Sequence, residues 1–159
     1  MKEECFVAHQ DLAAPRAEVF AFFADPANLE RLTPPWLRFE ILTPDPLPRG
    51  EGALFAYRIR LHGIPVSWRT LIERYEHGVC FVDRQLQGPY ALWHHTHGFE
   101  DLAGGGTRIL DRVRYRVGWG LFGRLATRLW VRRQVAEIFA YRRARLEALF
   151  AGTGGATGG

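Results

Sequence analysis

The chain has 159 residues, of which 47% are hydrophobic and 24% are charged, and its net charge is +4. This length gives room for one domain with a sizeable core and leaves little for a second. No stretch approaches the roughly 20 consecutive apolar residues that cross a bilayer, so we expect no stable membrane insertion. The acidic start, Met1–Cys5, lacks the features of a signal peptide, which favours a cytoplasmic location.

The only cysteines, Cys5 and Cys80, are too few for a disulfide framework. Both have apolar neighbours in the sequence. We therefore expect two buried free thiols with a structural role.

The first part of the chain predicts one strand and two short helices. Residues Cys5–Leu12 resemble a strand, and Pro15 stands where a helix can begin. Apolar residues at helical spacing follow until Asp25-Pro26, where the proline ends the helix. A second short helix is predicted over Ala27–Leu32, because Thr33-Pro34-Pro35 stops it.

From Trp36 onward, short segments of period two alternate with clusters of Gly, Pro and Asp, a pattern typical of strands and tight turns. Most connections are short, which favours antiparallel neighbours. The predicted strands are Leu37–Leu42, Ala53–Leu61, Val66–Glu73, Cys80–Gln85, Leu92–Glu100 and Arg108–Tyr115.

After Gly123 the apolar period becomes helical and continues to about Phe150, which predicts a helix roughly 40 Å long. The residues near its apolar face are Leu125, Leu129, Val135, Ile138, Phe139, Leu146 and Leu149. The tail Ala151–Gly159 contains only Gly, Ala and Thr and is expected to be disordered. Residues 1–150 are therefore expected to form a single domain.

This order of elements predicts an α+β fold in which a curved antiparallel sheet of about seven strands surrounds a long C-terminal helix. The two short helices fall between strands 1 and 2. One helix is too narrow to cover the inner face of so many strands, so we expect a pocket between the sheet and the helix.

Several segments resemble the START-like superfamily, which has the helix-grip fold and includes polyketide cyclases/dehydrases and Bet v 1-like proteins. The resemblance runs from about Phe6 to Phe150 and is nearest to the bacterial ligand-binding branch called SRPBCC. The segments that carry it are Ala14-Pro-Arg-Ala-Glu-Val-Phe20, Asp25-Pro-Ala-Asn-Leu29, Leu32-Thr-Pro-Pro-Trp36 with Phe39-Glu-Ile41, Gly88-Pro-Tyr-Ala-Leu-Trp-His-His-Thr-His-Gly-Phe-Glu100 and Gly105-Gly-Thr-Arg-Ile-Leu-Asp-Arg-Val113. It implies a ligand-binding fold without naming the ligand.

The segment Trp93-His-His-Thr-His97 places His95 and His97 on one face of a strand and His94 on the other. A metal site would need a third ligand, which Asp83 or Asp111 on flanking strands could supply for zinc or ferrous iron. No recognised metal-ligand spacing supports this alternative, so we expect no metal or other cofactor. The interpretation that we favour is a pocket wall.

The predicted wall follows two alternating stripes on neighbouring strands, capped by the long helix. His95 or His97 beside Asp111 would form an acid–base pair and is the candidate for catalysis. The predicted ligand-binding residues are Trp93, His95, His97, Phe99, Ile109, Asp111, Val113, Tyr115, Leu125 and Leu129.

Two other patterns receive structural interpretations. Gly118-Trp-Gly-Leu-Phe-Gly123 matches a dinucleotide-binding motif, but no strand follows the helix to complete that unit, so we interpret it as a bend. The arginines of the long helix are interrupted by Glu137 and Glu147, which favours a solvated face over nucleic-acid binding. They are Arg128, Arg132, Arg133, Arg142, Arg143 and Arg145.

We therefore expect a monomer or homodimer that binds a small hydrophobic molecule, such as a lipid, a polyketide or an aromatic compound, as a carrier or sensor. One alternative is an enzyme of the cyclase/dehydrase kind that uses His95 or His97 with Asp111. Another is an interaction domain that contacts ribosomes or membranes through the arginines of the long helix.

Overall fold

The computed structural model describes residues 3–61, 63–118 and 124–152, with the side chains of residues 124–128 left aside. One antiparallel sheet has the strand order β1-β7-β6-β5-β4-β3-β2. The strands are β1 (Glu4–Leu12), β2 (Glu40–Ile41), β3 (Leu54–Leu61), β4 (Ile64–Glu76), β5 (Cys80–Gln87), β6 (Tyr90–Asp101) and β7 (Thr107–Val117). The helices are α1 (Arg16–Ala24), α2 (Leu29–Leu32) and α3 (Arg124–Phe150), with 3₁₀ turns at Pro26–Asn28 and Pro35–Leu37.

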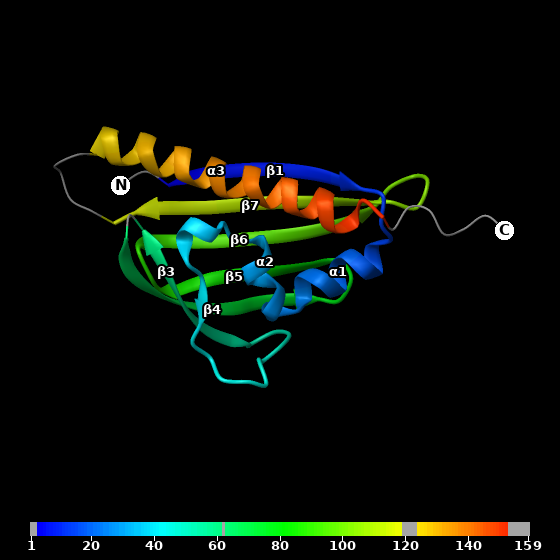
Figure 1. Ribbon diagram of the computed structural model, residues 1–159, viewed down its shortest axis with the longest axis horizontal. Helices are drawn as coiled ribbons and strands as arrows, with labels where there is room; N and C mark the ends of the chain where they lie inside the picture. Colours follow the sequence, from blue (N-terminus) through cyan, green and yellow to red (C-terminus); the bar gives the residue numbers. More distant parts are fainter. Residues whose placement is uncertain (1–2, 62, 119–123, 153–159) are drawn as a thin grey trace.

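The predicted fold class is confirmed: short helices precede strand β2, and α3 packs on the inner face of the sheet. Figure 1 shows α3 running along β1 and β7, whereas α1 and α2 lie over the middle strands. The pairing of β4 with β5 shifts between Arg69 and Thr70 and again between Ile72 and Arg74. Irregularities of this kind bend a strand and increase its twist, which favours a concave inner face.

The strands differ from the prediction mainly at their ends, with one larger exception. The expected strand Leu37–Leu42 is reduced to Glu40–Ile41. Pro34 and Pro35 start a 3₁₀ turn instead, and Arg38 ends that turn with a left-handed backbone, φ 44°. The chain therefore changes direction before it can pair with β3.

The prediction of two buried thiols is wrong for Cys5, which is exposed, and Cys80 is half-buried. Cys5 lies on β1, where alternate side chains point away from the core. Its neighbour two positions along, Val7, is 65% exposed. The sequence neighbours of Cys5 are apolar, but strand phase decides which of them is buried.

The core contains three apolar clusters on the inner face of the sheet. The first packs α1 and the end of α3 against β5 to β7 and includes Phe20, Phe99 and Leu146. The second lies between α3 and the pair β1/β7. The third lies at β3 and β4 around Trp68. Space remains among the three clusters, because α3 covers the β1/β7 side of the sheet.

None of the described helices is long and apolar enough to cross a membrane. The glycine motif Gly118–Gly123 lies almost wholly outside the described residues, as does most of the tail Ala151–Gly159.

Candidate functional site

A cavity of about 220 Å³ lies between the inner face of β3 to β6, the short helices and α3. Most of its lining is apolar, which is typical of sites for small organic ligands. The apolar lining includes Phe22, Phe23, Leu29, Leu32, Leu37, Phe55, Ile59, Phe81, Ile138 and Phe139.

Four aromatic side chains, which we call the aromatic cluster, line one part of the cavity: Tyr57, Trp68, Tyr90 and Trp93. The Trp68 ring lies 5.7 Å from Tyr57, 5.6 Å from Tyr90 and 5.4 Å from Trp93, centroid to centroid. Burial raises the pKa of the Tyr57 and Tyr90 hydroxyls, so both remain neutral. The buried Nε1 of Trp68 has no hydrogen-bond partner within the described residues.

Charged and polar side chains gather beside the aromatic cluster, and we call them the histidine cluster: Asp83, His95, His97, Asp111 and Arg142. In the sheet, Asp83 lies opposite His95, and His97 lies opposite Asp111. Side chains directly opposite each other on one face of a sheet have Cβ atoms about 5 Å apart. The pairing of β5, β6 and β7 therefore brings the four sheet residues together before any side chain adjusts.

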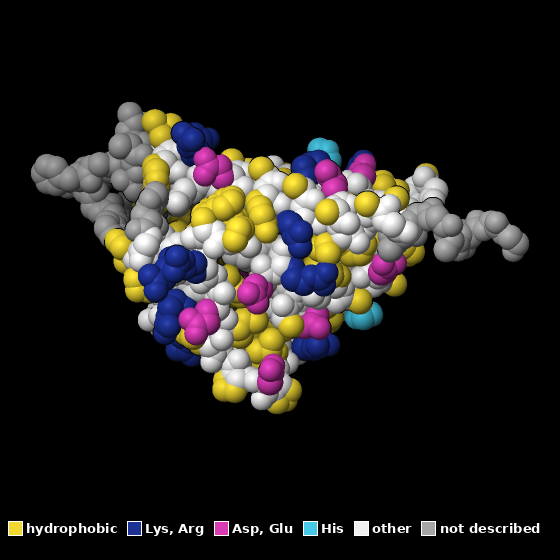
Figure 2. Space-filling model, viewed as in Figure 1, with side chains coloured by type: hydrophobic (Ala, Val, Ile, Leu, Met, Phe, Trp, Pro, Cys, Tyr) yellow, Lys and Arg dark blue, Asp and Glu magenta, His cyan; other side chains and the backbone are white. Residues whose placement is uncertain are grey.

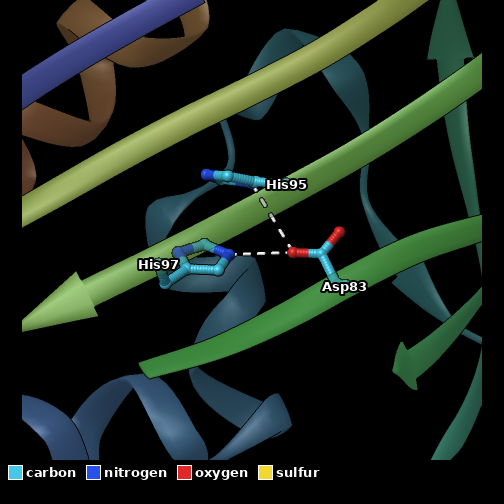
Figure 3. A group of neighbouring side chains, drawn as sticks. All are labelled: Asp83, His95 and His97. Carbon is cyan, nitrogen blue, oxygen red and sulfur yellow. Dashed lines mark hydrogen bonds and ion pairs between the residues drawn. The ribbon is translucent and has the colours of Figure 1, made fainter. Parts of the chain in front are cut away.

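Each imidazole contacts both carboxylates. The Nε2 atom of His95 lies 2.8 Å from Oδ1 of Asp111, and its Nδ1 lies 3.5 Å from Oδ2 of Asp83. The Nε2 atom of His97 lies 2.8 Å from that same Asp83 oxygen, and its Nδ1 lies 3.2 Å from Oδ1 of Asp111. Figure 3 shows both rings directed at the Asp83 carboxylate.

The two histidines have different protonation equilibria although their ring centroids are 3.7 Å apart. Burial and the positive charge of His97 lower the pKa of His95 to about 4. Burial also opposes the charged form of His97, but hydrogen bonds with Asp111 and Asp83 outweigh it and raise the pKa of that residue. The cluster therefore pairs a neutral imidazole with one that holds its proton more firmly.

Both carboxylates remain ionised. Burial alone would raise the pKa of Asp111, but Arg142 and the hydrogen bonds from His95 and His97 bring it well below the ordinary value. The pKa of Asp83 is also lowered, because the attraction of both histidines exceeds the cost of burial.

Arg142 joins the site from α3, although its position in the sequence suggested a solvated helix face. Its side chain is only 11% exposed, and its Nη2 lies 3.2 Å from Nδ1 of His97 and 3.8 Å from Oδ1 of Asp111. The guanidinium also lies over the rings of Phe23 and Phe139. Its spacing in the sequence could have indicated this position. Arg142 comes seven residues after Val135 and four before Leu146, which places it on the same helix face as these two buried residues.

Other arginines of α3 make ion pairs near the surface. Arg133 bonds Glu137 at 2.8 Å and Arg132 bonds Glu4 at 3.0 Å. On the face shown in Figure 2, acidic side chains lie among the basic ones. This mixture differs from the uninterrupted basic surface that nucleic acids bind.

The predicted wall residues fall into two groups. Trp93, His95 and His97 line the cavity, whereas the remaining described members are not among its lining residues. Phe99, Ile109, Val113 and Tyr115 are buried in the core, and Asp111 contacts the histidines from β7. The physical reason is the position of α3, which covers β7 and leaves the face of β3 to β6 open.

The residues of α3 that were predicted to cover the pocket, Leu125 and Leu129, are not found among its lining residues in the described part of the chain. Leu129 is 57% exposed and does not line the cavity, because it lies about a third of a turn from the face that contains Val135. The side chain of Leu125 lies outside the described residues. Ile138 and Phe139 approach the cavity from α3 instead.

His94 points to the other face of the sheet, as its position in the strand predicts, and bonds Glu73 at 3.1 Å. The aromatic lining from β3 and β4 was missed, because alternation identifies a buried face but not the part of that face that a helix leaves open.

The sequence matches the family model described as polyketide cyclase / dehydrase and lipid transport over residues 12–138. No match to this chain was found among curated proteins.

Solved structures share the fold at low sequence identity. The Zhui aromatase/cyclase from Streptomyces sp. R1128 is 16% identical with a TM-score of 0.67, over 95% of this chain and 99% of that one. A START superfamily protein from Mycobacterium smegmatis is 14% identical with a TM-score of 0.67, over 91% and 98% of the two chains. A nucleoside-diphosphate sugar epimerase from Corynebacterium glutamicum is 24% identical with a TM-score of 0.66, over 89% of this chain and 28% of that one. At these identities the likeness establishes the fold.

Proposed function

Since this chain belongs to the polyketide cyclase/dehydrase and lipid transport family, we propose that it binds a small, largely apolar molecule in its cavity, as a carrier or sensor. The observation that carries the proposal is a single space with an aromatic cluster on one side and a charged cluster on the other. Apolar lining supplies affinity at roughly 25 cal/mol per Å² buried, and a few polar groups orient the ligand.

The size of the cavity narrows the class of ligand. A cavity of about 150 Å³ holds one benzene molecule, whereas sites for drug-sized ligands are roughly 300 Å³ or larger. At about 220 Å³, this cavity suits a molecule of one or two rings with a polar substituent. A long acyl chain would require the walls to move apart.

The test is thermal unfolding with a panel of one-ring and two-ring aromatic compounds and, for comparison, long-chain fatty acids. A ligand present at 100 times its dissociation constant should add about 2.7 kcal/mol, which raises the melting temperature by roughly 5 to 10 °C. If no compound in the panel changes the melting temperature, the proposal fails.

A matched pair of variants on α3 locates the binding. Ile138→Trp puts a larger side chain into the lining and should abolish the ligand-induced rise in melting temperature. Leu129→Trp makes the same kind of change at an exposed position of that helix and should leave the rise intact. Equal loss in both variants would place the ligand elsewhere.

A second candidate function is catalysis of an aldol or dehydration step by the histidine cluster. The observation that favours it is two hydrogen-bonded His–Asp pairs, each 2.8 Å long, in which both imidazoles line the cavity. Such pairs are suited to move a proton to or from a bound carbonyl compound. An unchanged product profile from a poly-β-carbonyl substrate after His95→Ala and His97→Ala would rule it out.

A further inference from the structure

We propose that Asp83, His95 and His97 bind one divalent transition-metal ion and that Asp111 orients both imidazoles toward it. This inference goes beyond the binding of an apolar ligand and does not depend on it. It rests on the geometry of five buried or nearly buried side chains that three strands and one helix bring together.

The three donor groups are close enough to share an ion. One donor atom from each residue lies within 4.8 Å of the others. The Oδ2 atom of Asp83 lies 2.8 Å from Nε2 of His97 and 3.5 Å from Nδ1 of His95. Atoms bound to one ion at about 2.1 Å in a tetrahedral arrangement lie about 3.4 Å apart, so small movements of the side chains suffice.

The hydrogen-bonding capacity of the histidines supports a cation at this point. A neutral imidazole has one N–H donor and one lone pair, and an ionised carboxylate can only accept. Both nitrogens of each ring lie within 3.5 Å of a carboxylate oxygen. A neutral His97 can donate from Nε2 to Asp83 and accept at Nδ1 from Arg142. In a neutral His95, by contrast, one lone pair faces a carboxylate oxygen, and a cation between them removes that repulsion.

A proton on both rings is a poor alternative. The ring centroids are 3.7 Å apart and both side chains are 6% exposed, so two imidazolium charges would repel strongly in a poorly solvated place. When His95 is neutral and donates from Nε2 to Asp111, its Nδ1 lone pair is left facing Asp83. An ion bound to that nitrogen satisfies the lone pair and the carboxylate together.

Asp111 occupies the position of an orienting group. It lies 2.8 Å from Nε2 of His95 and 3.2 Å from Nδ1 of His97, and in each ring the other nitrogen faces Asp83. Histidines that bind metals almost always donate the second ring N–H to a carboxylate, a carbonyl or water. Asp111 thus fixes the tautomer of His95. With an ion at Nε2 of His97, the proton of that ring lies on Nδ1 and faces Asp111, and the Arg142 N–H that lies 3.2 Å from Nδ1 turns to the Asp111 carboxylate.

The charges in the cluster leave room for a cation. Metal binding requires both imidazoles to be neutral and displaces the proton of His97, after which the two carboxylates exceed the single guanidinium of Arg142 by one negative charge. Arg142 contacts Nδ1 of His97 and Oδ1 of Asp111, on the side of the ring opposite the Asp83 contact. The guanidinium thus balances Asp111 and leaves Asp83 for the ion.

Two nitrogens and one carboxylate favour zinc, ferrous iron or cobalt, whereas magnesium and calcium prefer oxygen ligands alone. All three residues also line the cavity, so a bound ion retains coordination positions that face it.

The experiment uses the full chain after treatment with a chelator, without any organic ligand. Calorimetric titration with Zn²⁺ should give one site with a dissociation constant in the micromolar range or tighter. Added Co²⁺ should develop the intense visible absorption of a four- or five-coordinate site with nitrogen ligands, unlike the pale spectrum of hydrated Co²⁺. Mg²⁺ should not compete.

Four variants locate the site. Asp83→Asn and His95→Gln should each weaken Zn²⁺ binding by at least about 100-fold, and Asp111→Asn by about 10- to 100-fold. His94→Gln, on the same strand but the other face, should bind as the parent does. Circular dichroism establishes that each variant is folded.

Failure of the parent protein to bind Zn²⁺ or to change the Co²⁺ spectrum would overturn the inference, even if every variant unfolds. Unchanged binding in Asp83→Asn, or equal loss in His94→Gln, would also overturn it. Binding of apolar compounds is measured separately in the presence of chelator, so the two proposals can fail independently.

Discussion

The aromatic cluster and all of the histidine cluster except Asp111 line one cavity, and Trp93 and His95 are separated by a single residue on β6. The first consists of rings whose polar atoms are neutral. The second places two carboxylates, two imidazoles and a guanidinium in a buried space. The comparison teaches that apolar contact and charge are divided along one strand. Under the proposed function, the aromatic rings would hold a ligand and the charged groups would meet its polar end.

The two clusters also differ in their cost to folding. Burial of aromatic surface stabilises the folded state, whereas burial of ions costs several kcal/mol each before their mutual attraction compensates. Removal of one charged member of the histidine cluster therefore leaves the others buried without a partner. Such a change should cause the largest loss in the free energy of unfolding.

Asp111→Ala should reduce the free energy of unfolding by about 3 to 5 kcal/mol, because it leaves Arg142 and two imidazoles without their shared carboxylate. The matched control is Asp101→Ala, which removes an Asp that is 65% exposed and bonded to Arg16. That change should cost less than about 1 kcal/mol. Urea unfolding in the presence of chelator measures both, and equal losses would contradict the proposed interdependence of the cluster.

The pH dependence of stability separates the two histidines. The unfolded chain protonates His95 near pH 6.5, whereas the folded protein resists until about pH 4, so this group removes stability as the pH falls between these values. The loss approaches about 3 kcal/mol at pH 4. His97 acts in the opposite direction, because its raised pKa adds stability below pH 6.5 that is lost as the pH rises through the folded value.

In the presence of chelator, the contribution of the two histidines to the free energy of unfolding should therefore be largest near pH 6.5. Urea unfolding at a series of pH values measures the curve. In His95→Gln the decline on the acid side should become shallower. A parent protein whose stability is constant from pH 6.5 to 4.5 would show that His95 titrates normally.

The smallest expected effect concerns the affinity for a hydrocarbon such as naphthalene. Trp93→Ala should weaken binding by about 30-fold, equivalent to about 2 kcal/mol of lost apolar contact. Asp83→Asn should change it by less than about threefold, because a hydrocarbon makes no use of the carboxylate. Calorimetric titration compares the two, and a larger effect from Asp83→Asn would reverse the roles given to the clusters.

Sequence periodicity predicted the sheet well, because strand phase depends on local alternation. Trp93, His95 and His97 were placed on one face with His94 on the other, and the structure agrees. Asp111 and Asp83 were recognised as neighbours of the histidines, because cross-strand pairing follows from short connections. The long helix was also predicted with its end near Phe150.

The contribution of α3 to the cavity was not predictable in the same way. The rotation of a helix about its axis depends on the surface against which it packs. Arg142 points inward because the carboxylates of Asp83 on β5 and Asp111 on β7 attract its guanidinium. An arginine is normally assigned to solvent, so the pattern favoured Leu129 over Arg142. The position of α3 over β7, which decides which strands remain open, is likewise a property of the assembled domain.

The pairing of β1 with β7 sets the order in which this molecule can be completed. Leu12 of β1 lies opposite Thr107, and Gln10 donates a hydrogen bond to the Arg143 carbonyl on α3. At 5 to 20 residues per second, β1 waits roughly 5 to 20 seconds on the ribosome for its partner strand. Arg142 emerges later still. The proposed binding site is therefore complete only after α3 has been translated, and before that point a nascent chain has no enclosed cavity to offer a ligand.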